Sequence, residues 1–333
     1  WQDRCTPQGI DSLQEDEIIR YPGGKKGNPD NKENLGISMA WWDPVSEDEE
    51  HTDGMVASRA IEMIERNKDK PFFVAAGVFN PHCPYVAPKK YFDLYPFESI
   101  SIPDLEASKQ DLEDVPPMAI QRDSGPRWPF YKGEKITIDD ARKCKQAYFA
   151  CISFVDAQIG RIMDALEANK LMDDTLIVVW SDHGYFLGEK GLWYKRKNFE
   201  RSLRVPLIIA GGGVNAQIQS CDRPVELLDL YPTIVDHTGY EVPSVLEGES
   251  LVPLMNDPSG AWDKPAISQV IYSRGEAFGF SLRNQRWRYT EWKKGAAGRE
   301  LYDHANDPDE VTNLAENPEH AALIEKLSAQ LKP

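Results

Sequence analysis

The sequence predicts an α/β fold in which a mostly parallel sheet is sandwiched by helices, followed by a small C-terminal α+β subdomain. Apolar runs of strand length alternate with segments of helical periodicity over most of the chain, which is typical of parallel sheets covered by helices. After Pro265, apolar and polar residues alternate instead, as they do in exposed antiparallel strands. We therefore expect two domains, 1–263 and 264–333.

Apolar residues at helical spacing predict four helices, over 56–64, 139–171, 229–237 and 318–331. Asp53 is a plausible cap for the first helix, and Asp139 and Asp140 begin the second. Asp229 can cap the third, which has Pro232 in its first turn.

Continuous apolar runs predict buried strands over 71–79, 175–180 and 205–210. Two antiparallel strands are predicted within 278–295, with a turn near Arg283 and Asn284. The segment 103–138 is rich in proline and irregular, so we expect a surface excursion that shapes a pocket.

The charge of the chain argues against nucleic acid or an anionic membrane as its main partner. The net charge is −16, whereas both of those partners favour a basic surface. No apolar run approaches the roughly 18 residues that span a bilayer, and residues 1–20 lack the pattern of a signal peptide. The opening is polar and has no initiating Met, so we expect that an upstream piece is missing.

One local cluster has the opposite sign. Between Lys190 and Arg204 six basic residues face one acid, Glu200, a net charge of +5. This cluster indicates either an anionic substrate or a solvated basic face.

The numbers and spacings of the cysteines and histidines limit which kind of metal site the chain could form. Five cysteines without CxxC spacing form neither a disulfide framework nor a zinc finger, and Cys144 and Cys151 are predicted to pack in the core. Six histidines without HxxH or HxxxH spacing argue against a multi-histidine zinc or iron site. An oxygen-rich site for calcium, or less well magnesium, fits better.

Asp182 and His183 are the best candidates for metal ligands. They follow the predicted strand 175–180 directly, and ligands bind at the carboxyl ends of strands in open α/β sheets. The alternative is an ordinary polar turn with Gly184 as its hinge.

His82 and Lys195 are the candidates for contact with an anionic substrate. His82 follows the predicted strand 71–79 and could donate a hydrogen bond or act as a general acid, or it packs between its neighbours. Lys195 lies in a glycine-containing loop after His183 and supplies a mobile positive charge. Trp193 and Tyr194 beside it either stack on a ring of the substrate or anchor the loop.

These motifs together resemble those of the sulfatases, most closely the iduronate 2-sulfatase-like members. PFFVAAGVFNPHCPY contains His82, and TLIVVWSDHGYFLGEKGLWYK contains Asp182, His183 and Lys195. QAYFACISFVDAQIGRIMDAL, RVPLIIAGGG, VELLDLYPTIVDHTG and ELYDHANDPDEVTNLAENPEH also match. The resemblance covers the chain from about residue 53 onward and implies an alkaline-phosphatase-like fold.

The resemblance implies a metal-dependent sulfuric ester hydrolase that acts on a sulfated sugar or glycan. Asp182 and His183 would bind the metal, with calcium favoured over magnesium. His82 and Lys195 would be catalytic residues that contact the sulfate. The resemblance also implies a periplasmic or secreted location, and it leaves the oligomeric state open.

One family motif departs from the pattern. The nucleophile of these sulfatases is a formylglycine made from the cysteine of Cys-x-Pro-Ser-Arg, and Cys5-Thr6-Pro7-Gln8-Gly9 lacks the arginine. We therefore expect formylglycine upstream of Trp1, and no turnover by this chain alone. Two alternative functions stay open. The chain could belong to a phosphatase, phosphodiesterase or phosphonate hydrolase of the same superfamily. It could also be the remnant of a sulfatase that has no catalytic activity and binds sulfated glycans through the basic cluster.

Overall fold

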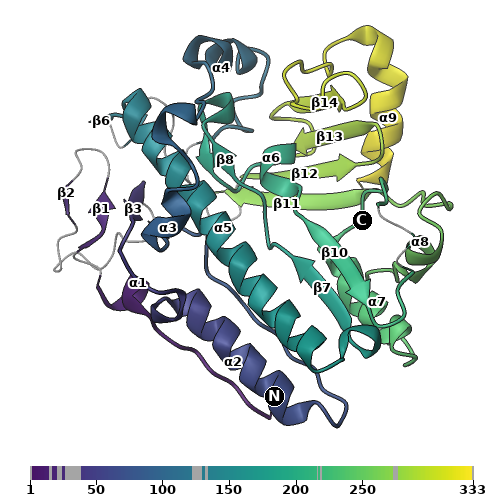
Figure 1. Cartoon of the computed structure of the whole chain (residues 1–333). Helices are drawn as coiled ribbons and strands as arrows, with labels where there is room; N and C mark the ends of the chain where they lie inside the picture. Colours follow the sequence, from purple (N-terminus) through teal and green to yellow (C-terminus); the bar gives the residue numbers. More distant parts are fainter. Residues whose placement is uncertain are drawn as a thin grey trace. The chain divides into compact units, whose positions relative to one another are not determined.

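The structure is a computed structural model that describes residues 2–14, 17–20, 25–26, 39–121, 130–131, 134–215, 217, 220–272 and 277–331. The chain divides into two compact units (Figure 1). The first comprises Trp1–Leu105 and Pro126–Asp173, and the second comprises Glu106–Gly125 and Asp174–Pro333. None of the described helices is both long and apolar enough to cross a bilayer. The predicted boundary between residues 263 and 264 falls inside the second unit and stays a prediction.

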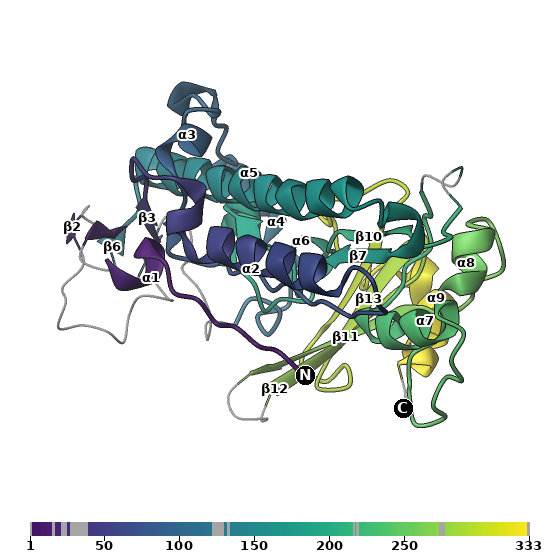
Figure 2. The ribbon, with the colours of Figure 1, turned by 60° about the horizontal axis from the view of Figure 1, so that its bottom comes forward.

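Two long helices, α2 (Thr52–Asn67) and α5 (Ile138–Ala168), pack side by side in the first unit (Figures 1 and 2). Both were predicted from their apolar spacing. The Thr137 hydroxyl accepts a hydrogen bond from the Asp140 backbone N–H, and the Asp140 carboxylate accepts one from the Thr137 N–H, at 3.1 and 2.9 Å. This capping box fixes the start of α5. Cys144 and Cys151 are fully buried and unbridged, as predicted.

The remaining elements of the first unit are short. A small sheet has the order β2-β1-β3-β4, in which β3 and β4 run parallel and the other pairs antiparallel. The strands are β1 (Ile19–Arg20), β2 (Lys25–Lys26), β3 (Ala40–Trp42), β4 (Tyr85–Val86), β5 (Phe130–Tyr131) and β6 (Glu134–Lys135). The short helices are α1 (Ile10–Leu13), η3 (Asp48–Glu50), α3 (Lys89–Phe92) and η4 (Phe97–Ser99).

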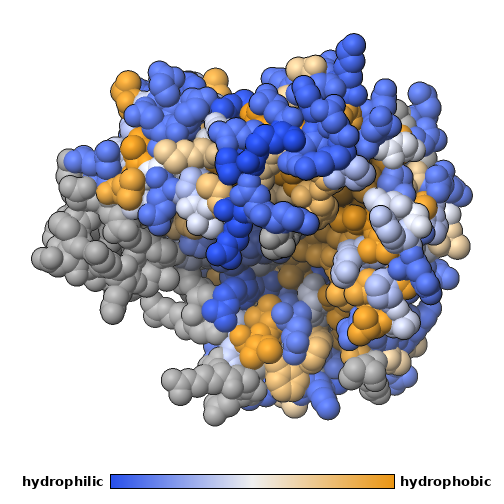
Figure 3. Space-filling model, turned by 90° about the horizontal axis from the view of Figure 1, so that it is seen from below, coloured by the Kyte–Doolittle hydropathy of each residue, from blue (hydrophilic) through white to orange (hydrophobic). Residues whose placement is uncertain are grey.

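The prediction of a buried strand over 71–79 is wrong for the described structure. The segment is not assigned to a strand, and most of its residues are exposed, including Phe73 at 66% and Phe79 at 52%. An apolar run shows that side chains favour burial, but it does not specify the neighbouring strand that would pair with the backbone. Apolar residues also reach the surface on the face of the molecule shown in Figure 3.

The second unit contains the predicted strands near 175–180 and 205–210, as β7 (Leu176–Trp180) and β10 (Leu207–Gly211). They pair antiparallel, with Val179 opposite Ile208, rather than parallel as we expected of successive strands. The same region contains the helix α6 (Glu200–Leu203). It also contains a sharp turn at Gly212. Trp180, the last residue of β7 before the predicted metal ligands, pairs with Leu207, the first residue of β10.

A four-stranded antiparallel sheet and a terminal helix complete the second unit, as the alternating pattern after Pro265 predicted. The sheet has the order β11-β12-β13-β14, and the helix α9 packs on β13 (Figure 2). The bounds are β11 (Ala266–Tyr272), β12 (Ala277–Arg283), β13 (Trp287–Trp292), β14 (Arg299–Asp303), η9 (Pro318–His320) and α9 (Ala321–Gln330). The sheet buries the aromatic residues Tyr272, Trp292 and Tyr302 on one face, and Leu282, Tyr289 and Leu301 on the other.

Other elements of the chain are short connections. They are α4 (Leu105–Asp111), η5 (Met172–Asp174), β8 (Phe186–Leu187), η6 (Glu189–Gly191), β9 (Trp193–Tyr194), η7 (Leu227–Asp229), α7 (Leu230–His237) and α8 (Val252–Asn256). The prediction of a surface excursion over 103–138 is wrong for part of its described residues, because Val115 and Ala119 are buried in the aromatic core of the second unit. Residues 122–129 and 132–133 lie outside the described part.

Candidate active site

His82 lies in a tight turn of the first unit, between the exposed segment 71–79 and β4. Its backbone N–H donates to the Phe79 carbonyl at 3.0 Å, and the rings of Phe79 and His82 are 4.9 Å apart. Its Nδ1 is 2.6 Å from the Cys83 carbonyl oxygen, which can only accept. Nδ1 therefore carries a proton, and Nε2 is the basic nitrogen of the neutral ring.

Asp53 holds the start of this turn. It lies in the first turn of α2 and is 1% exposed. Its Oδ1 accepts a hydrogen bond from the Phe79 N–H at 2.6 Å, and its Oδ2 accepts from the backbone and the side-chain amide of Asn80 at 2.9 and 3.0 Å. Burial raises the pKa of the Asp53 carboxyl above its ordinary value, although these hydrogen bonds oppose the shift. The predicted capping role is wrong, because His51 is the N-cap and Asp53 binds the distant turn.

A cavity of about 280 Å³ lies beside the turn. Phe79, Asn80 and His82 line one part of it, and α1 with its flanking residues lines another part. The remaining wall residues are Gln8, Asp11, Ser12, Ile18, Cys83, Pro84 and Val86. Its size lies near the lower end of the range for small-molecule sites.

Asp182 and His183 follow β7 in the second unit and contact each other. Asp182 Oδ2 lies 3.4 Å from His183 Nε2, and the Asp182 side chain is 82% exposed. His183 Nδ1 is 2.9 Å from the Gly184 carbonyl oxygen, which can only accept, so Nδ1 carries a proton and Nε2 is the ring nitrogen on the side of Asp182. One carboxylate and one imidazole nitrogen therefore lie close together at the end of β7.

Gly184 anchors this turn to α6. Its N–H donates to the Ser202 carbonyl at 2.8 Å, and a Cβ atom at this position would lie 2.3 Å from the Arg201 carbonyl oxygen. Only glycine allows the two backbones to approach so closely. The turn that carries Asp182 and His183 is thus fixed by a backbone contact rather than by a loose hinge.

Lys195 directly follows the β8–β9 hairpin, in which Phe186 pairs with Tyr194. The residues on either side of it, Tyr194 and Arg196, have φ angles of +75° and +69°. Left-handed φ angles on both sides of one lysine are costly for residues other than glycine, and such strain is concentrated at functional sites. Trp193 and Tyr194 are buried, so they anchor the loop instead of presenting rings to a substrate.

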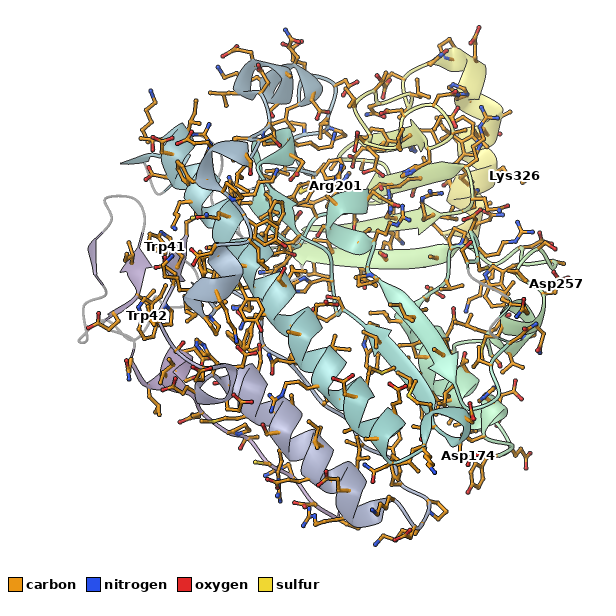
Figure 4. The ribbon with its side chains drawn as sticks, viewed as in Figure 1. Trp41, Trp42, Asp174, Arg201, Asp257 and Lys326 are labelled. Atoms are coloured by element: carbon orange, nitrogen blue, oxygen red, sulfur yellow. The ribbon has the colours of Figure 1, made fainter. Side chains whose placement is uncertain are left out.

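The basic cluster of 190–204 is not a continuous open surface. Lys190 is 4% exposed and its ammonium pairs with Asp111 at 2.6 Å, while Lys197 is 3% exposed and donates to the Gln121 carbonyl at 2.8 Å. Arg201, labelled on α6 in Figure 4, pairs with Asp309 at 2.7 Å. These internal pairings weaken the interpretation of the cluster as one anion-binding face.

A buried charge network links α6 to the C-terminal sheet. The Arg288 guanidinium binds both Glu200 and Glu310, and the Glu200 backbone N–H donates to Glu310 at 2.8 Å. His304 Nε2 lies 3.0 Å from Glu310. Among the described residues Glu200, His304 and Glu310 lie close enough to hold a metal, but the Arg288 cation already neutralises the two carboxylates.

The donor set at 182–183 fits a divalent cation as part of a larger ligand set. Calcium takes six to eight oxygen ligands, and Asp182 and His183 supply at most three donor atoms. The predicted site residues are thus divided: the second unit contains Asp182, His183 and Lys195, and the first contains His82. The sequence analysis did not connect Asp53 and Asn80 with the His82 turn, because their contact with each other spans 27 positions and leaves no local signal.

Known proteins match most of the chain. Residues 2–240 match the family model described as Sulfatase, and residues 188–333 match the one described as N-sulphoglucosamine sulphohydrolase, C-terminal. A sulfatase of Formosa agariphila is 37% identical over 279 residues, covering 84% of this chain and 53% of that protein. Iduronate 2-sulfatase of Homo sapiens is 29% identical over 320 residues, covering 72% of this chain and 56% of that protein.

A solved structure also resembles the chain. The phosphonate monoester hydrolase from Silicibacter pomeroyi has a TM-score of 0.77 and 25% identity, and the match covers 95% of this chain and 64% of that one. This likeness, together with the family model, confirms the predicted alkaline-phosphatase-like α/β fold. The chain spans about half the length of the curated relatives it matches.

Proposed function

We propose, from the premise that this chain belongs to the sulfatase family, that it supplies cation-binding and sulfate-binding side chains for the hydrolysis of a sulfate ester on a sugar or glycan. The observation that carries the proposal is the pair of the exposed Asp182 and the half-buried His183, whose Oδ2 and Nε2 atoms lie 3.4 Å apart at the end of β7. The name of the iduronate 2-sulfatase relative supports a sulfated sugar as the substrate class.

The proposed roles follow from the chemistry of each side chain. Asp182 and His183 bind a divalent cation, for which we propose calcium, and a bound cation polarises the oxygens of a sulfate group. Lys195 offsets negative charge on the sulfate. His82, with Nδ1 engaged by Cys83, uses Nε2 toward the substrate and in its protonated form donates a proton to the leaving oxygen. The proposed nucleophile is the formylglycine of the family, and we assign no described residue to that role.

Calcium and ligand titrations test the metal and sulfate roles together. Calorimetry would measure the binding of glucose 6-sulfate with and without calcium chloride in the unmodified chain, in D182N and in D174N. Asp174 is an exposed carboxylate at the other end of β7 and provides the matched control (Figure 4). We expect calcium to tighten ligand binding in the unmodified chain and in D174N, and D182N to lose this effect. Identical calcium dependence in D182N would overturn the proposed ligand.

The sulfate contacts are tested by K195M and H82A. Each should weaken glucose 6-sulfate binding about tenfold, which is the loss of about 1.4 kcal/mol from one charge-assisted contact. K326M removes an exposed lysine of α9 and should leave binding unchanged (Figure 4). Unchanged binding in both K195M and H82A would contradict the assignment.

A second candidate is the hydrolysis of a phosphonate or phosphate monoester, which the likeness to the phosphonate monoester hydrolase favours. Calorimetric titrations with phenyl sulfate and with phenyl phosphonate decide between the two candidate functions. Tighter binding of phenyl phosphonate than of phenyl sulfate would favour the second candidate.

A further inference from the structure

Asp11 of α1 lines the cavity beside His82, and one of its two carboxylate oxygens is available to a ligand. Its Oδ1 accepts hydrogen bonds from the backbone N–H and the hydroxyl of Thr52, at 2.8 and 3.0 Å. Its Oδ2 makes no hydrogen bond or ion pair with any described residue, and it is not one of the buried oxygens that lack a partner. Oδ2 is therefore accessible, and the two contacts with Thr52 orient the carboxylate that carries it.

The negative charge of Asp11 makes the cavity favourable for a cation. Among the described residues that line the cavity there is no lysine or arginine, and His82 is the one side chain that can become positively charged. Burial raises the pKa of the Asp53 carboxyl behind the turn, and the negative charge of Asp11 adds to the shift. The charge of Asp11 therefore reaches the turn that carries His82, and a positively charged group in the cavity would compensate it.

The other walls of the cavity suit a small ring that carries polar groups. Phe79, Ile18 and Val86 are apolar wall residues, and the Phe79 side chain is 52% exposed. An aromatic ring attracts a cation that lies over its face, and it also packs against C–H groups. Gln8 and Ser12 are exposed wall residues with hydrogen-bonding side chains. The walls therefore match a ligand that has an apolar ring face, hydroxyl groups and one positive charge.

We propose that Asp11 Oδ2 binds the ammonium group of a sulfated amino sugar. Such a sugar is a zwitterion, because it carries a negative sulfate group and a positive ammonium group. The cavity wall offers a partner for each charge, since the proposed function assigns the sulfate to His82 and Asp11 remains for the ammonium group. This inference rests on the proposed function and narrows its substrate class to sugars with a free amino group. Asp11 is then a specificity residue.

Calorimetry with two ligands and three variants tests the proposal in the presence of calcium chloride. The unmodified chain should bind glucosamine 6-sulfate about tenfold more tightly than glucose 6-sulfate, in which a hydroxyl replaces the amino group. D11N keeps an oxygen that can accept from Thr52 but has no charge, so it should bind the two ligands within about twofold of each other. D11E keeps the charge and should retain the preference. D69N removes an exposed carboxylate of the same unit that does not line the cavity, and it should behave like the unmodified chain.

A third ligand covers the case in which D11N does not fold. N-acetylglucosamine 6-sulfate keeps the nitrogen atom without its charge, so the unmodified chain should bind it no more tightly than glucose 6-sulfate. Equal affinities of the unmodified chain for all three sugars would overturn the inference, and so would a preference for glucosamine 6-sulfate that is unchanged in D11N. If the unmodified chain binds none of the three sulfated sugars, the proposed function itself fails.

Discussion

At the scale of single residues, Glu300 makes the stability of the protein depend on pH. Its side chain is buried among aromatic residues, where Trp292 Nε1 and the Tyr302 hydroxyl donate to it at 2.6 and 3.0 Å. Burial raises the pKa of Glu300 to about 7, and the negative charge of Glu310 adds to the shift. The folded protein therefore holds a proton between pH 4.5 and 7 that the unfolded chain has lost.

We expect the free energy of unfolding to fall as pH rises through this window, by about 3 kcal/mol in total from Glu300. E300Q keeps the shape and hydrogen-bonding capacity of the side chain but cannot titrate. Urea unfolding at pH 5, 6, 7 and 8 should show a smaller decrease for E300Q than for the unmodified chain. Parallel pH profiles of the two proteins would show that Glu300 does not titrate in this range.

At the scale of elements, the contact of the 181–184 turn with α6 depends on Gly184. G184A would place a Cβ atom 2.3 Å from the Arg201 carbonyl oxygen, so the turn must move. We expect a loss of about 1 to 3 kcal/mol in stability and weaker calcium binding. Thermal unfolding and calcium titration measure the two effects.

G160A is the control for this substitution. Gly160 lies within α5, and a Cβ atom there meets nothing within 4 Å. Alanine should stabilise the helix by about 0.5 to 1 kcal/mol. If G184A and G160A change stability in the same direction, the close approach at Gly184 is not what requires glycine.

The elements also show what sequence patterns can predict. The α5 helix, the α7 helix and the β12–β13 pair agree with their apolar periodicity, because each buries one face along its own length. The 71–79 segment does not, because its pairing depends on a partner strand that its own residues do not specify. The antiparallel pairing of β7 with β10 was missed for the same reason.

The residues of the candidate site were also predicted only in part. Asp182, His183 and Lys195 follow recognisable motifs, whereas Asp53 and Asn80 acquire their places through a tertiary contact. Lys190 and Lys197 fit neither of the two interpretations of the basic cluster, because both are buried. Their charges are visible in the sequence, but their contacts with the Asp111 carboxylate and the Gln121 carbonyl arise only in the folded chain. The assignment of His82, Lys195, Asp182 and His183 to a single active site stays a prediction.

At the scale of the whole molecule, the net charge of −16 predicts a dependence of stability on salt. Repulsion among like charges destabilises a folded protein, and salt screens it: the Debye length falls from about 30 Å at 0.01 M to about 10 Å at 0.1 M. We expect the unfolding temperature to rise by about 1 to 3 °C over this range of sodium chloride. Tetramethylammonium chloride should have the same effect, and a constant unfolding temperature in both salts would contradict the prediction.

The network around Glu310 connects the C-terminal part of the second unit to the 181–184 turn. Glu310 binds the backbone of Glu200 in α6, and the Ser202 carbonyl of α6 in turn holds the Gly184 N–H beside Asp182. A frameshift or nonsense codon between positions 205 and 310 would leave every codon of the 181–184 turn and of α6 intact and still remove Glu310, which binds α6. If Asp182 binds the proposed cation, such a truncation would impair the same site as a missense variant at Asp182.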